Sequence, residues 1–162
     1  MTSSKALQSE IGMAPGEDMG ASDWLVVTQE FINKFADATL DQDPMHVDPE
    51  WCRAHGPFKT TISFGFLSLS LITHFSHQAR PWPAGSYALN YGLEKVRFVA
   101  PVPVGSRIRG VFRFLGADRR ADGGWLTRTE VTVEIEGSEK PAVAAEWLGV
   151  VYPAGSQAQA AG

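Results

Sequence analysis

The sequence predicts an α+β fold in which an antiparallel sheet wraps around one long buried helix. Segment 62–78 is apolar on nearly every side of a helix, which is typical of a buried helix and not of a surface one. Four later segments are rich in the β-branched and aromatic residues that favour strands: 86–99, 107–116, 125–136 and 142–152. Because helical patterns come first and strands follow in succession, we expect an antiparallel sheet whose apolar face is covered by the helix.

Length and composition narrow the class of protein. The chain has 162 residues, 44% of them hydrophobic and 20% charged, which fits a single globular domain. A net charge of −4 argues against a nucleic-acid surface, which needs a basic patch. Cys52 is the one cysteine, so no intramolecular disulfide can form. The longest apolar stretch, 62–75, is shorter than the ~20 residues of a membrane span, and no secretory signal is visible. We therefore expect a cytoplasmic protein.

The two ends differ in composition from the middle of the chain. Residues 1–20 are rich in small and polar residues and are expected to be flexible. Residues 154–162 form a low-complexity tail of Ala, Gly, Ser and Gln, which cannot offset the entropy cost of ordering. The folded domain is therefore expected over 21–153.

Capping residues delimit the helices of the first half. Thr28 can cap a helix over 29–39, whose apolar residues recur at helical spacing. Asp43-Pro44 must end any continuation of that helix, because the residue before a proline is pushed out of the helical region. Asp48-Pro49 has a good N-cap followed by proline at the first helical position, so a short helical piece begins there.

The densest group of titratable residues lies between these caps, in segment 41–49. A calcium loop beginning at Asp41 would need glycine at position 46 and glutamate at 52, and a zinc site would need more His or Cys. Asp43 has the pattern of a turn former and Asp48 that of a helix cap. His46 suits acid–base chemistry near neutral pH, and Pro44 can bend the loop so that Asp41 and His46 meet at one water. The pattern alone leaves both residues open to a structural or a catalytic role.

A family resemblance bears on that choice. The run Phe35-Ala36-Asp37-Ala38-Thr39-Leu40-Asp41-Gln42-Asp43-Pro44-Met45-His46-Val47-Asp48-Pro49 resembles the hydratase motif of MaoC-like dehydratases and (R)-specific enoyl-CoA hydratases. In that family Gly-Asp is followed by four residues and then His-x-Asp. The resemblance extends over roughly 20–152 and is carried also by 56–58, 62–67, 91–98 and 101–106.

The resemblance implies a single hot-dog fold and a reaction. Asp41 and His46 match the catalytic pair, which would hold one water whose hydroxyl adds to C3 of a trans-2-enoyl-CoA while C2 takes a proton, giving an (R)-3-hydroxyacyl-CoA. Gly65 matches the glycine whose backbone N–H faces the thioester carbonyl. Leu40 and Phe64 depart from the family, which has glycine and histidine there, and Phe64 is expected to line the acyl pocket. No metal or redox cofactor is implied.

The expected partners are an acyl-CoA substrate, with acyl carrier protein as the alternative carrier, and a second copy of the chain. A homodimer would cover the free edge of a single hot-dog sheet. Two alternative functions stay open. A hot-dog thioesterase is disfavoured because 62–78 contains no Asp or Glu. A non-catalytic acyl-thioester-binding subunit is disfavoured by the presence of both Asp41 and His46, but the changes at Leu40 and Phe64 keep it open.

Overall fold

The structure is a computed structural model that describes residues 2–156. The helices are α1 (Thr2–Ile11), α2 (Gln29–Thr39), α3 (Pro44–Val47), α4 (Pro49–Ala54), α5 (Gly65–Ser70) and α6 (Ile72–Ala79). The strands are β1 (Asp18–Ala21), β2 (Leu25–Val26), β3 (Tyr87–Phe98), β4 (Arg107–Arg119), β5 (Trp125–Ile135) and β6 (Val143–Tyr152). The four predicted strand segments thus correspond to β3, β4, β5 and β6.

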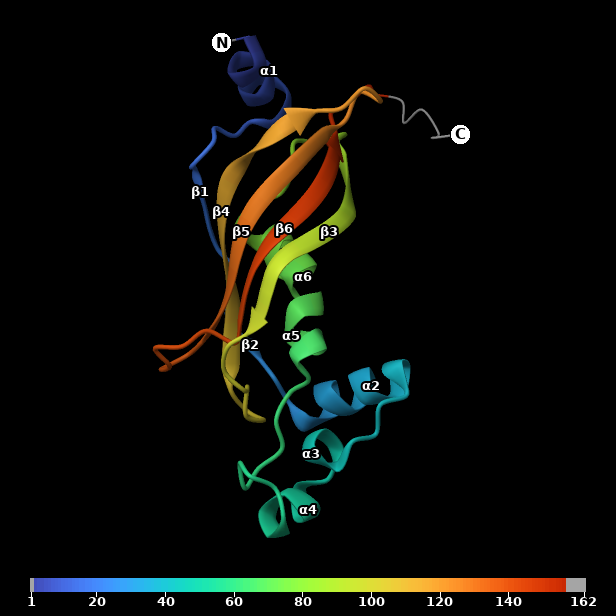
Figure 1. The fold of residues 1–162 in the computed structure, drawn as a ribbon, viewed down its shortest axis with the longest axis vertical. Coiled ribbons are helices and arrows are strands. Elements are labelled where there is room, and N and C mark those ends of the chain that lie inside the picture. The colour runs from blue at the N-terminus through green and yellow to red at the C-terminus, as the bar shows by residue number, and fades with distance from the viewer. Residues whose placement is uncertain (1, 157–162) are drawn as a thin grey trace.

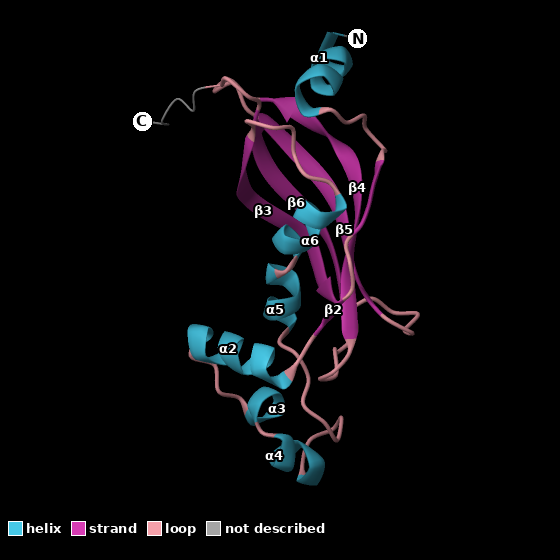
Figure 2. Cartoon of the chain, turned by 180° about the vertical axis from the view of Figure 1, so that it is seen from behind, coloured by secondary structure: helices cyan, strands magenta, loops and turns pink. Residues whose placement is uncertain are grey.

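The strands form one antiparallel sheet in the order β1-β4-β5-β6-β3, with β2 paired to another part of β4. Helices α5 and α6 follow each other along one face of this sheet, while α2, α3 and α4 gather beyond its end (Figures 1 and 2). Alternate residues of β5 are buried and face the helices. The predicted α+β architecture, a sheet wrapped around a central helical element, is confirmed.

A close contact between α6 and β4 brings the helix onto the sheet. Gly110 on β4 has no side chain, and a Cβ built there would lie 2.6 Å from Cβ of Phe75 and 2.7 Å from the ring of Phe112. Both phenylalanines are almost fully buried and belong to the main hydrophobic core. Glycine at position 110 therefore lets the helix approach the sheet more closely than any other residue would.

The central helix differs from the prediction at its start and in its middle. It was expected over 62–78 but begins at Gly65, because Ile62 bridges Pro103 and the N–H of Ser63 donates to the carbonyl of Val102 at 2.7 Å. The backbone is therefore engaged with another segment before the helix starts. Leu71 divides α5 from α6, but its φ of −71° and ψ of −12° stay in the helical region, so the two helices form one rod.

The N-terminal segment also differs from the expectation of a flexible 1–20. Residues 2–11 form α1, and Leu7 and Ile11 are buried in the core. Glu10 accepts a hydrogen bond from Nε1 of Trp125 on β5 at 3.0 Å, which fastens α1 to the sheet. The apolar positions were too sparse in the sequence to reveal this packing. The predicted tail at 154–162 lies outside the described residues from 157 onward, and the domain limits 21–153 stay a prediction.

Within residues 2–156, no helix combines the length and the hydropathy that crossing a bilayer requires.

Candidate active site

Successive caps fix the loop that carries His46. The hydroxyl of Thr28 accepts from the N–H of Phe31, as predicted for the start of α2. Asp43 accepts from the N–H of Met45 at 2.8 Å and so caps the four-residue α3 that contains His46. Asp48 accepts from two N–H groups at the start of α4, which confirms its predicted capping role. Each turn of the loop is thus held by a short-range hydrogen bond.

The imidazole of His46 has a defined tautomer in its neutral form. Nδ1 lies 2.7 Å from the carbonyl oxygen of Ile62, and a carbonyl can only accept a hydrogen bond. Nδ1 therefore carries the proton, and Nε2 keeps the lone pair that a general base needs. The ring also packs on Phe64, with 3.8 Å between the ring centroids.

Phe64 packs against the ring of His46 and is not among the residues that line the adjoining cavity. Only 5% of its surface is exposed, and its ring centroid lies 5.2 Å from that of Phe35 on α2. The expectation that Phe64 lines the acyl pocket stays a prediction. Its contact with the imidazole holds the ring of His46 in place.

Gln29 also contacts the loop that carries His46, and no pattern in the sequence pointed to this residue. Its side-chain amide donates to the backbone carbonyl of His46 at 2.7 Å and accepts from the hydroxyl of Thr61 at 2.5 Å. This one side chain therefore connects α2, the loop that carries His46 and the segment before α5. The three residues are far apart in the chain, so no local motif links them.

Cys52 holds the other side of the loop. Its thiol donates weakly to the carbonyls of Pro44 and Met45, each at 3.4 Å. Burial, and then the negative charges of Asp48 and Asp43, raise the pKa of the Cys52 thiol. The thiol therefore stays protonated and acts as a small buried support for α3.

A cavity of about 250 Å³ opens beside His46. Its walls include Gly65 and Ser68 at the start of α5, together with the segment 98–102. No side chain caps α5, so the N–H groups of its first turn are available to a developing negative charge. Gly65 also has a packing reason to be glycine, because a Cβ there would lie 2.8 Å from Cδ1 of Phe98.

The other predicted catalytic residue, Asp41, does not line this cavity. Its carboxylate is exposed and accepts from the N–H of Asp43 at 3.2 Å. Leu40 precedes it with a left-handed φ of 61° and is 87% exposed, so Leu40 does not shape the cavity either. The structure thus brings His46, Phe64 and Gly65 together and leaves Asp41 on the outside of the turn.

The family model for the MaoC like domain matches residues 10–135, most of the chain. The chain belongs to the MaoC-like dehydratase family. It is 48% identical over 138 residues to "3-hydroxyacyl-thioester dehydratase Z" of Mycobacterium tuberculosis, covering 85% of this chain and 91% of the relative. The predicted family, and with it an enzyme of the hydratase and dehydratase class, is confirmed.

Solved structures support the same fold. The monoamine oxidase regulatory protein from Archaeoglobus fulgius superimposes with a TM-score of 0.75 at 22% identity, covering 88% of this chain and 92% of that one. The (R)-hydratase from A. caviae superimposes with a TM-score of 0.67 at 23% identity, covering 87% and 97%. At this identity the likeness concerns the fold, and it confirms the predicted hot-dog arrangement.

Proposed function

We propose that this MaoC-like protein catalyses the reversible hydration of a trans-2-enoyl-CoA to an (R)-3-hydroxyacyl-CoA. The observation that carries the proposal is the anchored imidazole of His46, whose Nδ1–H is held by the carbonyl of Ile62 while the ring lines a cavity that begins at Gly65. A relative with 48% identity that is named a 3-hydroxyacyl-thioester dehydratase supports the acyl thioester as the substrate class. Coenzyme A is the proposed carrier, with acyl carrier protein as the alternative.

The reaction needs one base, one acid and a site for negative charge. Nε2 of His46 removes a proton from the bound water, the oxygen of that water adds to C3, and the double-bond electrons move toward the thioester oxygen. The N–H of Gly65 stabilises the resulting enolate oxygen, and the proton that His46 took from the water is then delivered to C2, so His46 acts first as base and then as acid. In this proposal Asp41 holds the same water, which requires its exposed carboxylate to turn away from the N–H of Asp43.

Two alternatives lead to different products. A thioesterase would need a carboxylate near the thioester, and the rod formed by α5 and α6 contains no Asp or Glu. A non-catalytic subunit would bind acyl thioesters without turnover. Because Asp41 is exposed and does not line the cavity, the test must also distinguish a non-catalytic binding subunit from a hydratase.

The test follows the loss of enoyl absorbance with trans-2-enoyl-CoAs of several chain lengths. We expect turnover by the wild-type protein, and a fall of about 100-fold or more in kcat for His46→Ala and for Asp41→Asn, because each removes a group that handles the proton or the water. His74→Ala and Asp23→Asn are matched controls at exposed positions away from the cavity, and they should leave kcat unchanged.

The alternatives give other readouts in the same samples. Release of free coenzyme A without formation of a 3-hydroxyacyl-CoA would identify a thioesterase. Binding of acyl-CoA by the folded protein with no reaction at all would identify a binding subunit and contradict the hydratase. If His46→Ala retained full activity, the proposed base would be wrong even with an active enzyme.

We further propose that the working unit is a homodimer formed through β3. This strand lies at the edge of the sheet and pairs only with β6 among the described strands. Its apolar side chains are exposed, among them Leu89, Tyr91 and Leu93. A long apolar edge strand is rarely left open in a soluble protein, and pairing with a second copy would cover it.

A further inference from the structure

The inner face of β5 carries two buried hydroxyl groups where apolar residues are the rule. Along the strand the buried positions are Trp125, Thr127, Thr129, Val131, Val133 and Ile135. Thr127 is 2% exposed and Thr129 is 4% exposed. Burying a hydroxyl is unfavourable unless the group finds a hydrogen-bond partner, so each of these threonines calls for one.

The two threonines differ in their partners. The hydroxyl of Thr127 donates to the carbonyl of Gly149 on β6 at 3.0 Å. The structure shows no hydrogen bond from the hydroxyl of Thr129 to another described residue. Every fully enclosed side-chain nitrogen or oxygen among the described residues has a partner, so the hydroxyl of Thr129 is not fully enclosed. The Thr129 hydroxyl therefore opens into the cavity that the residue lines, and it is free to bind a ligand.

This second cavity has a volume of about 140 Å³ and lies between α6 and the sheet, away from His46. Figure 2 shows α6 lying over this face of the sheet. Thr73 and Ser76 on α6 add hydroxyl groups to its wall, while Trp82 and Trp147 supply large apolar surfaces. Apolar walls with a few polar groups are typical of a small-molecule site.

Arg80 and His77 are the titratable residues that line the second cavity, and His77 is exposed at the surface. The guanidinium of Arg80 lies 2.8 Å from the carboxylate of Glu17 and also donates to the carbonyl of Gly12 at 2.9 Å. Because Glu17 neutralises this arginine, the cavity offers no unpaired guanidinium to a carboxylate. The ligand that suits it is uncharged, mainly apolar, and carries an oxygen that can bond to a hydroxyl.

The helical rod links the two cavities. Gly65 begins α5 at the catalytic cavity, and Thr73 lies on α6 at the second one. Eight helical residues advance about 12 Å along the axis. An acyl chain of medium length is long enough to span this distance from a thioester carbonyl at Gly65.

We propose that the second cavity receives the distal part of the acyl group and selects tails that carry a neutral oxygen, a hydroxyl or a ketone, through a hydrogen bond to Thr129. This inference rests on the proposed hydratase function and adds a substrate class to it. Thr129 is a specificity-determining residue in this assignment, because it touches the tail of the substrate and not the reacting atoms.

The test compares pairs of trans-2-enoyl-CoAs of equal length, one with an alkyl tail and one with a hydroxyl or ketone at successive positions in its distal half. For the wild-type protein we expect the best oxygenated substrate to exceed its alkyl partner in kcat/KM. Thr129→Val keeps the shape and removes the hydroxyl, so this preference should fall by about three- to tenfold. Thr129→Ser should keep the preference, and Thr132→Val, on the other face of the same strand, should not change it.

Each result separates this inference from the hydratase proposal. Turnover with no preference for oxygenated tails, or a preference that survives in Thr129→Val, would overturn the role of Thr129 and leave the hydratase intact. A preference for carboxylate tails would overturn the neutral character of the cavity. If no enoyl-CoA is turned over, the cavity is tested by measuring the binding of the corresponding saturated acyl-CoAs by calorimetry. Equal affinities for oxygenated and alkyl tails would then overturn the inference.

Discussion

At the residue scale, Leu40 carries backbone strain at an exposed position. It ends α2 with φ 61° and ψ 22°, and its side chain is 87% exposed. A left-handed conformation is unfavourable for any residue with a Cβ, and glycine adopts it freely. Replacing Leu40 with glycine should therefore raise the free energy of unfolding by roughly 0.5–1 kcal/mol, the relief of strain being partly offset by the entropy of glycine in the unfolded chain.

The measurement is urea unfolding of the wild type, Leu40→Gly and Leu40→Ala. Alanine retains the Cβ and the strain, so it should change stability little. Equal stabilisation by both substitutions would mean that the leucine side chain, and not the backbone, is unfavourable in the folded state.

The motif in the sequence led to His46 but did not predict its surroundings. The aspartate-to-histidine spacing identified the residue, and the structure places its ring at a cavity with Gly65. The support from Gln29 could not be predicted, because that residue joins His46 and Thr61 across distant parts of the chain. The outward position of Asp41 depends on the left-handed turn at Leu40, which a leucine in the sequence does not indicate.

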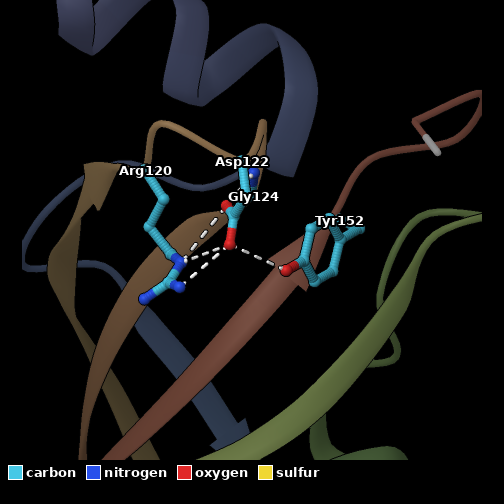
Figure 3. A network of polar contacts seen from close by, with 4 residues as sticks. All are labelled: Arg120, Asp122, Gly124 and Tyr152. Atoms are coloured by element: carbon cyan, nitrogen blue, oxygen red, sulfur yellow. Dashed lines mark hydrogen bonds and ion pairs between the residues drawn. The ribbon is translucent and has the colours of Figure 1, made fainter. Parts of the chain in front are cut away.

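At the scale of elements, the turn between β4 and β5 is fastened to the end of β6 by one carboxylate. Asp122 accepts from Arg120 at 2.9 Å, from the N–H of Gly124 at 3.1 Å and from the hydroxyl of Tyr152 at 3.1 Å. Figure 3 shows the carboxylate of Asp122 between the side chains of Arg120 and Tyr152. The hydrogen bonds from Arg120 and then from Gly124 lower the pKa of Asp122 from 3.8 to about 2. The ionised carboxylate is therefore the form that the folded state favours.

This shift predicts a pH dependence of stability. Because the pKa is lower in the folded than in the unfolded chain, the contribution of Asp122 is complete above about pH 4 and is lost as the pH falls through about 2. Asp122→Asn should be less stable than the wild type at neutral pH, and the difference in urea midpoint should shrink as the pH drops from 4 toward 3. Asp23→Asn removes the same charge at an exposed position and should show no such trend. A difference for Asp122→Asn that stayed constant down to pH 3 would contradict the shift.

Elements with strong periodicity were predicted and those defined by tertiary contacts were not. β5 was expected over 125–136 and spans Trp125–Ile135, because its alternation of apolar and polar residues has a single interpretation. The apolar run at 62–78 is compatible with a helix or an extended chain at its start, and the pairing of Ile62 with Pro103 decides for the extended form. Strand β1 has four residues and is held by its pairing with β4, so it had no periodic signal of its own.

At the scale of the whole molecule, the exposed edge of β3 adjoins the cavity beside His46. Phe98 ends β3, is 48% exposed and lines the cavity beside His46. A second copy that paired with β3 would therefore lie next to the cavity and would exclude water from it. Oligomeric state and activity are expected to change together for this reason.

Leu93, 39% exposed, lies near the middle of β3, where a two-fold axis through an antiparallel pair would place it close to its own copy. Leu93→Lys should then bring two like charges together and convert a dimer into a monomer with reduced turnover. Light scattering coupled to size exclusion would detect this as a fall from twice the 17.6 kDa chain mass to that mass. Leu115→Lys, at an exposed apolar position on β4, is the matched control and should stay dimeric. A wild-type protein that is monomeric and fully active, or a Leu93→Lys variant that remains a dimer, would show that β3 is not the interface.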